Sequence, residues 1–236
     1  MIKKVERAIR DPRRVFAYLK MEVAFFRARK YPWSHDTDQR MKLRVYGSYP
    51  EYVEHQKEKL DLILKVGLPE YDKEYREVLK ERLKTLQILQ SGNSVLCLAA
   101  RLGTEVKSFL DLGCFAVGLD LNPGSNNPYV VHGDFHNIQY PDQCIDVVFT
   151  NSLDHALYLR RLINEIKRIL KPSGIVILEI IKGREEGSTP GAFESLSWEK
   201  IDDVLEPFLE SGFAIIKRSY FTFPWPGENI ILGISR

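Results

Sequence analysis

The stretch Ser94-Val95-Leu96-Cys97-Leu98-Ala99-Ala100-Arg101-Leu102-Gly103-Thr104-Glu105 decides the fold, and Ala116-Val117-Gly118-Leu119-Asp120-Leu121-Asn122-Pro123 follows it. In both places a short apolar run ends in a turn, and the second run ends on an acidic residue. Parallel α/β sheets build nucleotide-binding crevices in this way, with backbone amides at the first turn and a ribose-binding carboxylate after the next strand. The two runs therefore predict an α/β sheet with a crevice for a nucleotide-like ligand.

Length and composition narrow the class of protein. A chain of 236 residues fits one domain with an extension, and 44% hydrophobic with 28% charged residues is typical of a globular protein. No apolar run approaches the roughly 20 residues that span a bilayer, and the N-terminus lacks a signal-peptide core. The three cysteines have no metal-type spacing. We therefore expect a cytoplasmic protein without a metal site.

Charge is distributed unevenly along the chain. Residues 1–30 hold ten basic and three acidic residues, a net charge of +7, whereas residues 31–236 hold 24 basic and 29 acidic residues, a net charge of −5. The acidic body argues against duplex nucleic acid as a partner. Apolar residues recur in the basic segment at helical spacing, which leaves two interpretations: a helix on an anionic membrane or partner, or a helix packed on its own domain. The apolar residues are Val5, Ile9, Phe16, Leu19, Val23 and Phe26.

Strands and helices alternate from Ser94 onward. This order predicts a mostly parallel, seven-stranded, Rossmann-like sheet, which ends in an antiparallel hairpin because the last connection is too short for a parallel crossover. Before this sheet the sequence predicts a loop over Tyr31–Pro50 and two helices over Glu51–Val66 and Tyr71–Gln90. Residues 1–90 are therefore expected to form a helical extension, and residues 91–236 the main domain. The expected strands are Val95–Ala99, Ala116–Asp120, Tyr129–His132, Ile145–Thr150, Ile175–Ile180, Phe213–Phe221 and Asn229–Ser235, and the expected helices are Glu105–Leu112, Tyr158–Leu170 and Trp198–Ser211.

This order resembles the class I S-adenosylmethionine-dependent methyltransferases over Ser94–Arg236, about 60% of the chain. Four local motifs carry the resemblance in sequence order, and together they imply S-adenosylmethionine as the cofactor. They are the Val95–Glu105 turn, Gly118-Leu119-Asp120, His132-Gly133-Asp134-Phe135, and Asp146-Val147-Val148-Phe149-Thr150-Asn151-Ser152 followed by Ile169-Leu170-Lys171-Pro172-Ser173-Gly174.

The first turn departs from the family pattern Asp-x-Gly-x-Gly-x-Gly. This chain has Cys97, Ala99, Arg101 and Gly103 at those places, so only the last glycine is present. Either the cofactor site is degraded, or Arg101 itself contacts the ligand by pairing with the methionine carboxylate. We favour contact, because an unpaired buried arginine is costly. The Arg-x-Gly-Thr-Glu turn is also similar to an uncharacterised branch of the family.

The resemblance implies a set of cofactor-binding residues at the ends of successive strands. Asp120 binds the ribose hydroxyls, with a turn acid as the alternative, and Asp134 lies near the adenine amino group, with an Asx-turn as the alternative. The backbone N–H of Phe135 faces the adenine. The expected cofactor-binding residues are Ala99, Arg101, Gly103, Asp120, Leu121, Asn122, Gly133, Asp134, Phe135, Asn151 and Ser152.

Candidate catalytic groups follow the fourth strand of the main domain. His155 can take a proton from an acceptor hydroxyl or amine, although a packing or capping histidine fits the same pattern, and Asp154 is a weaker alternative base. Glu105 is expected to be structural. His132 and His136 lie on a strand-to-loop segment and do not predict a metal pair. The long insertion Gly183–Ser197 predicts an ordered lid over the acceptor.

The motifs together predict an S-adenosylmethionine-dependent methyltransferase acting on oxygen or nitrogen of a small-molecule, glycan or glycolipid acceptor. A non-catalytic methyltransferase-like protein that binds a partner or the cofactor is the alternative, since the first turn is poor in glycine. A nicotinamide-dependent oxidoreductase ranks low, because the chain lacks Gly-x-Gly-x-x-Gly. The basic residues 1–30 allow a peripheral membrane or protein contact.

Overall fold

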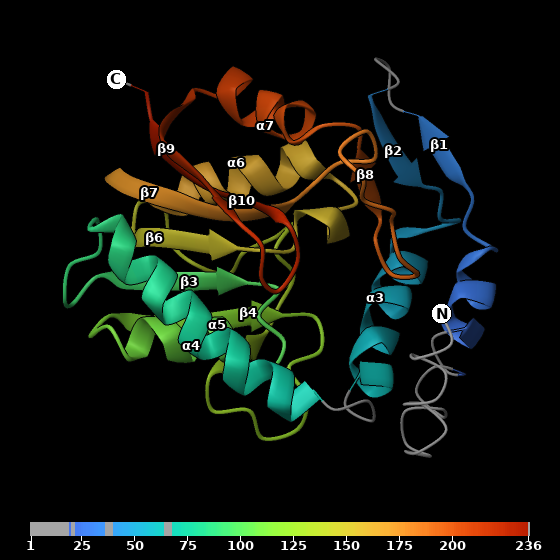
Figure 1. Ribbon diagram of the computed structural model, residues 1–236, viewed down its shortest axis with the longest axis horizontal. Coiled ribbons are helices and arrows are strands. Elements are labelled where there is room, and N and C mark those ends of the chain that lie inside the picture. Colours follow the sequence, from blue (N-terminus) through green and yellow to red (C-terminus); the bar gives the residue numbers. More distant parts are fainter. Residues whose placement is uncertain (1–18, 20–21, 36–39, 64–67, 236) are drawn as a thin grey trace.

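The computed structural model describes residues 19, 22–35, 40–63 and 68–235 (Figure 1). Residues 22–28 of the predicted N-terminal helix are helical, whereas Val5, Ile9 and Phe16 lie outside the described residues. Among the helices of the described part, none has both the length and the apolar character needed to cross a membrane.

The main sheet has seven strands in the order β5-β4-β3-β6-β7-β10-β9. The first five are parallel neighbours, and β10 pairs antiparallel with both β7 and β9. This confirms the predicted mostly parallel sheet with its terminal hairpin. The strands are β3 (Ser94–Leu98), β4 (Phe115–Asp120), β5 (Val130–His132), β6 (Ile145–Thr150), β7 (Leu170–Ile181), β9 (Phe213–Phe221) and β10 (Gly227–Ile234).

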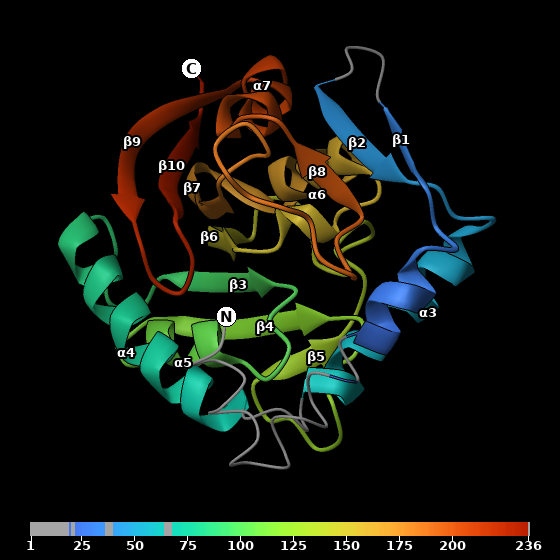
Figure 2. The same cartoon turned by 45° about the vertical axis from the view of Figure 1, so that its right-hand side comes forward.

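Helices cover both faces of this sheet (Figure 2). On one face, α4 (Leu68–Leu86) and α5 (Thr104–Leu110) share an apolar core with the strands. On the other, α6 (Leu159–Ile169) and α7 (Ile201–Glu210) form the second core. Because both faces are covered, the parallel strands are apolar along nearly their whole length, as the sequence indicated. Since α4 packs on the sheet, part of the predicted extension 1–90 contributes to the main core.

A second, three-stranded sheet was not predicted. It consists of β1 (Trp33–His35), β2 (Met41–Arg44) and β8 (Leu196–Trp198), in the order β1-β2-β8. The predicted loop Tyr31–Pro50 is therefore wrong in part, since it contains β1, β2 and the start of α3 (Tyr49–Ile63). These strands have three or four residues each. β1 pairs with the nearby β2, and β2 pairs with β8 about 150 positions away, so the local sequence does not mark the sheet.

The predicted helix Trp198–Ser211 begins too early. Trp198 ends β8, and α7 starts at Ile201 after a cap in which the backbone N–H of Lys200 donates to Asp203 Oδ2 at 2.7 Å. Pairing of Trp198 with Met41 of β2 keeps this residue extended. Tertiary pairing has overridden the local preference for helix at this point.

Arg44 ties the N-terminal elements to the insertion before β8. Its side chain is 6% exposed, and its guanidinium donates to the backbone carbonyls of Ala28, Tyr31, Gly191 and Glu194 at 2.6–3.1 Å. Burial lowers the pKa of Arg44 from its usual value. The small sheet and α3 lie beyond the arrowheads of β3, β4 and β6 (Figure 1). Ligands of open α/β sheets bind at this carboxyl edge.

Candidate active site

A cavity that opens to solvent, with about 550 Å³ of empty space including its mouth, lies at the carboxyl edge of the main sheet. The ends of β3, β4 and β5 and the segment after β6 supply one wall, and α3 supplies the other. The residues that line the cavity are Tyr52, Gln56, Lys59, Ala99, Arg101, Leu119, Asp120, Leu121, Asn122, Gly133, Phe135, Ser152 and His155. Nine of the twelve residues predicted for the site are brought together in this lining.

Three predicted residues, Gly103, Asp134 and Asn151, lie outside the lining. Gly103 precedes α5 with φ of 79°. The carboxylate of Asp134 accepts hydrogen bonds from the Tyr49 hydroxyl and, at 2.8 Å, from the backbone N–H of His136. Asn151 Nδ2 donates to Glu105 Oε1 at 3.0 Å, behind the turn. These residues support the segments that form the cavity wall.

The first turn keeps the backbone path of a glycine-rich turn with only one glycine. Ala99, Arg101 and Gly103 are all left-handed, with φ of 55°, 43° and 79°. The left-handed conformation costs an ordinary residue about 1–2 kcal/mol. Such strain persists where the surrounding structure enforces it, and it gathers at ligand sites. The alternation of left-handed residues is therefore a property of the site and not of the local sequence.

Asp120 clamps this turn to the end of β4. Its Oδ2 accepts the backbone N–H of Arg101 at 2.8 Å, and its Oδ1 accepts the backbone N–H of Asn122 at 2.7 Å. A carboxylate offers about four lone pairs, so each oxygen can still accept a hydroxyl from the cavity. The structure shows the turn-acid interpretation, and the ribose role of Asp120 stays a prediction for which lone pairs remain on both oxygens.

Arg101 places an unpartnered positive charge in the cavity. Its guanidinium makes no hydrogen bond or ion pair with any residue that the structure describes. Its charge still acts on its neighbours, because it lowers the pKa of His155 and opposes the rise at Glu105. Burial raises the pKa of Glu105 to about 7. A guanidinium that faces a cavity without a partner is suited to an anionic ligand group.

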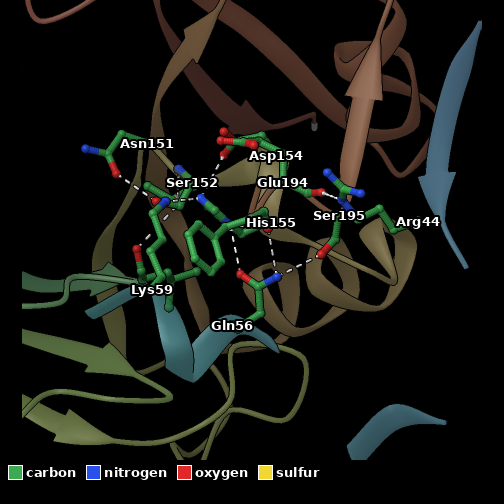
Figure 3. A network of polar contacts seen from close by, with 12 residues as sticks. Arg44, Gln56, Lys59, Asn151, Ser152, Asp154, His155, Glu194 and Ser195 are labelled. Atoms are coloured by element: carbon green, nitrogen blue, oxygen red, sulfur yellow. Dashed lines mark hydrogen bonds and ion pairs between the residues drawn. The ribbon is translucent and has the colours of Figure 1, made fainter. Parts of the chain in front are cut away.

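The imidazole of His155 lies between side chains of α3, with Gln56 at one ring nitrogen and Lys59 at the other (Figure 3). Its Nδ1 faces Gln56 Oε1 at 2.8 Å and the Phe193 carbonyl at 3.1 Å, both acceptors. We therefore assign the proton to Nδ1, which leaves a lone pair on Nε2. Burial, followed by the charges of Lys59 and Arg101, holds the pKa of His155 well below its usual value.

One face of α3 supplies cavity residues that the sequence analysis missed. Tyr52, Gln56 and Lys59 are spaced by four and three residues, so they share one side of the helix. Gln56 Nε2 donates to the Phe193 carbonyl and to Ser195 Oγ, both at 2.9 Å, which fixes the amide toward His155. A polar stripe at this spacing beside the apolar residues of the same helix is the signal that could have revealed them.

Lys59 approaches His155 from α3. Its Nζ lies 2.5 Å from His155 Nε2, where the lone pair points. Burial, with a further contribution from Arg101, lowers the pKa of Lys59. The lysine therefore covers the basic nitrogen of the histidine in this conformation.

The residues best suited to a metal among those described are Asp154, His155 and Glu194, whose ligand atoms lie within 4.8 Å of one another. Burial and the charge of Glu194 raise the pKa of Asp154 to about 7. A transition metal would require about 2.0–2.1 Å to the histidine nitrogen, a position that the Lys59 ammonium blocks. In this conformation Lys59 occupies the place that a metal ion would take beside Asp154, His155 and Glu194. His132 and His136 are not part of this cluster.

Leu153–His155 form a 3₁₀ turn after β6. A second cavity, with about 340 Å³ of empty space including its mouth, adjoins this turn. His155 lines the first cavity and Asp154 lines the second, together with Glu194, Thr189 and other residues of the predicted lid Gly183–Ser197. Ser195 N–H donates to the Asp154 carbonyl at 2.7 Å, so the lid is hydrogen-bonded to this turn.

Comparisons with known proteins agree with this architecture. A family model described as a methyltransferase domain matches residues 96–178. No curated protein matches the chain. Among solved structures, the PH0226 protein of Pyrococcus horikoshii OT3 has 19% identity and a TM-score of 0.54, over 69% of this chain and 92% of that one.

Two further structures are named as methyltransferases. A SAM-dependent methyltransferase of Aquifex aeolicus has 15% identity and a TM-score of 0.53, over 65% of this chain and 88% of that one. The glycopeptide N-methyltransferase MtfA, complexed with S-adenosylmethionine, has 18% identity and a TM-score of 0.53, over 66% and 86%. Likeness at these identities shows that the fold is shared.

Proposed function

We propose that the chain is an S-adenosylmethionine-dependent methyltransferase that holds its cofactor in the cavity at the ends of β3 and β4. The observation that carries the proposal is the strained turn at Ala99 and Arg101, clamped by Asp120 and facing the cavity. The methyltransferase-domain match over residues 96–178 supports it.

The cavity has the donors and acceptors that this cofactor needs. Asp120 has free lone pairs for the ribose hydroxyls, and Leu119, Leu121 and Phe135 offer apolar surface for the adenine. Arg101 offers the methionine carboxylate a guanidinium that pairs with none of the described residues. In this assignment Gly103, Asp134 and Asn151 act from behind the wall, as supports of the turn and of the loop after β5.

When bound, the cofactor supplies an activated methyl group for an in-line displacement, so the protein mainly positions the two reactants. Methylation of a neutral hydroxyl or amine releases one proton, which the lone pair on His155 Nε2 accepts. Lys59 must move away from Nε2 for this step. Gln56 and the Phe193 carbonyl keep the proton on Nδ1 and hold the ring in place.

For the acceptor we propose a hydroxyl or amine on a small molecule, glycan or glycolipid, bound in the second cavity beside Asp154. The net charge of −5 over residues 31–236 disfavours duplex nucleic acid. MtfA, which has a similar fold, is a glycopeptide N-methyltransferase. The chemistry of the bound acceptor decides whether an oxygen or a nitrogen atom is methylated.

A protein that binds the cofactor without methyl transfer is the second candidate. The contact of Lys59 with His155 Nε2 favours it, because this contact occupies the only lone pair of the ring. The two candidates agree on cofactor binding and differ on turnover.

Calorimetric titration with S-adenosylhomocysteine tests the shared step, with NAD as the control ligand. Micromolar binding that is lost in Asp120→Ala supports the cofactor site, and absence of binding refutes both candidates. Radiolabelled S-adenosylmethionine is then incubated with small-molecule, glycan and glycolipid fractions. Transfer that falls in His155→Gln supports the enzyme, and binding without transfer to any fraction supports the second candidate.

A further inference from the structure

The N-terminal helical segment exposes an apolar stripe that the proposed function does not use. Val23 and Phe26 are three residues apart on the helical residues 22–28 and are 50% and 71% exposed. Leu19, four residues before Val23, is also helical and 56% exposed. A surface helix of a globular protein normally turns such a stripe toward the core. This one faces away from it.

The opposite face of the same helix is already packed. Ala24 and Ala28 are buried and form a small apolar cluster with Ala192 and Phe193 of the lid. The Arg44 guanidinium also donates to the Ala28 carbonyl at 3.1 Å. Because these contacts fix the rotation of the helix, Val23 and Phe26 are held outward beside the lid.

Basic side chains flank the apolar stripe. Arg27, Arg29 and Lys30 are exposed, and neither arginine forms an ion pair with a described residue. Lys30 reaches Glu51 at 3.6 Å. Residues 1–30 carry a net charge of +7 against −5 for the rest of the chain. The positive charge is thus concentrated in the segment that exposes the stripe.

We propose that this segment docks the protein on an anionic lipid bilayer. The headgroup region offers negative charge for the arginines and lysine, and the acyl boundary beneath it accepts the apolar side chains of Leu19, Val23 and Phe26. A helix with protruding apolar side chains, flanked by arginines that form no ion pair with a described residue, fits this surface without a matching groove. The docking goes beyond the proposed function and does not depend on it.

Co-sedimentation of the full chain with vesicles tests the proposal. We expect binding to vesicles of phosphatidylcholine mixed with phosphatidylglycerol, weaker binding at high salt, and little binding to phosphatidylcholine alone. The double variant Val23→Ser/Phe26→Ser should bind about tenfold more weakly or worse. Phe115→Ser is the matched control, since Phe115 is 75% exposed at the start of β4, away from this helix.

A second pair of variants separates charge from apolar contact. Arg27→Gln/Arg29→Gln should reduce binding and flatten its salt dependence, because it removes two positive charges. Neither side chain has an ion-pair partner to lose among the described residues. Thermal melting and S-adenosylhomocysteine titration check that each variant folds. If Val23→Ser/Phe26→Ser does not fold, the single variant Phe26→Ser takes its place.

Three results would overturn the proposal. The first is that the wild type binds neither kind of vesicle. The second is that the serine variants bind as tightly as the wild type or the Phe115→Ser control. The third is that the wild type binds no vesicles and self-associates in sedimentation velocity, whereas Val23→Ser/Phe26→Ser is a monomer. That result would assign the apolar stripe to a contact with a second copy of the chain.

Discussion

Replacing Arg101 by glycine should stabilise the fold and weaken the cofactor at the same time. Arg101 has φ of 43°, and glycine removes the left-handed strain of about 1–2 kcal/mol. The added freedom of the unfolded chain offsets about 0.4–1 kcal/mol of this gain. The net is on the order of 1 kcal/mol, which raises the melting temperature by about 2–4 °C for a chain of this size.

The same change removes the unpaired guanidinium from the cavity. If Arg101 holds the methionine carboxylate, the lost hydrogen bond to a charged group costs about 1.5–3 kcal/mol, or roughly tenfold to hundredfold in the dissociation constant. The fold loses no ion pair, since the guanidinium has none among the described residues. Stability and affinity should therefore move in opposite directions.

The assay combines thermal melting with calorimetric titration of S-adenosylhomocysteine and of 5′-methylthioadenosine, which lacks the amino-acid end. Arg101→Gly should weaken only the first ligand, and Ala99→Gly is the control because it relieves similar strain without removing a charge. Equal weakening of both ligands would refute the carboxylate assignment. A lower melting temperature for Arg101→Gly would refute the strain argument.

Asp120→Ala should weaken S-adenosylhomocysteine by about 1–3 kcal/mol in titration, because it removes the ribose acceptor and the clamp on the turn; unchanged affinity would exclude the ribose role. Arg44→Met should destabilise the protein by about 2–4 kcal/mol in urea unfolding, because four carbonyls lose a charged donor, and a change below about 0.5 kcal/mol would show that the arginine does not hold the lid. His155→Gln should reduce transfer while leaving cofactor affinity unchanged, and wild-type transfer should persist below pH 6.5, since the histidine pKa is lowered in the fold; a loss of activity near pH 6.5 would contradict this. The pKa of Glu105 is raised to about 7, so its carboxyl stabilises the fold relative to the ionised form at low pH and this contribution is lost as pH rises through 7; the melting temperature of Glu105→Gln relative to wild type should accordingly be higher at pH 8 than at pH 5, and a pH-independent difference would count against the shift.

The sheet and its helices were accessible from sequence because their signals are local. β6 was predicted to the residue at Ile145–Thr150, and β9 at Phe213–Phe221. Long apolar runs between turns mark buried parallel strands, and the short 222–226 connection allows only an antiparallel hairpin. The small sheet of β1, β2 and β8 left no such mark, since its strands are only three or four residues long and the pairing of β2 with β8 joins segments about 150 positions apart.

By itself, the sequence determined the main sheet and predicted the residues that follow its strands, among them Ala99, Asp120 and His155, because in a parallel sheet all carboxyl ends meet at one edge. Only the tertiary structure decided what faces them. The α3 residues Gln56 and Lys59 reach His155 across about 100 positions of chain, Gln56 at Nδ1 and Lys59 at Nε2. The left-handed turn at Arg101 is likewise imposed by Asp120, 19 residues away. Hydrogen bonds and charges act through space, so these relations become visible only once the chain is folded.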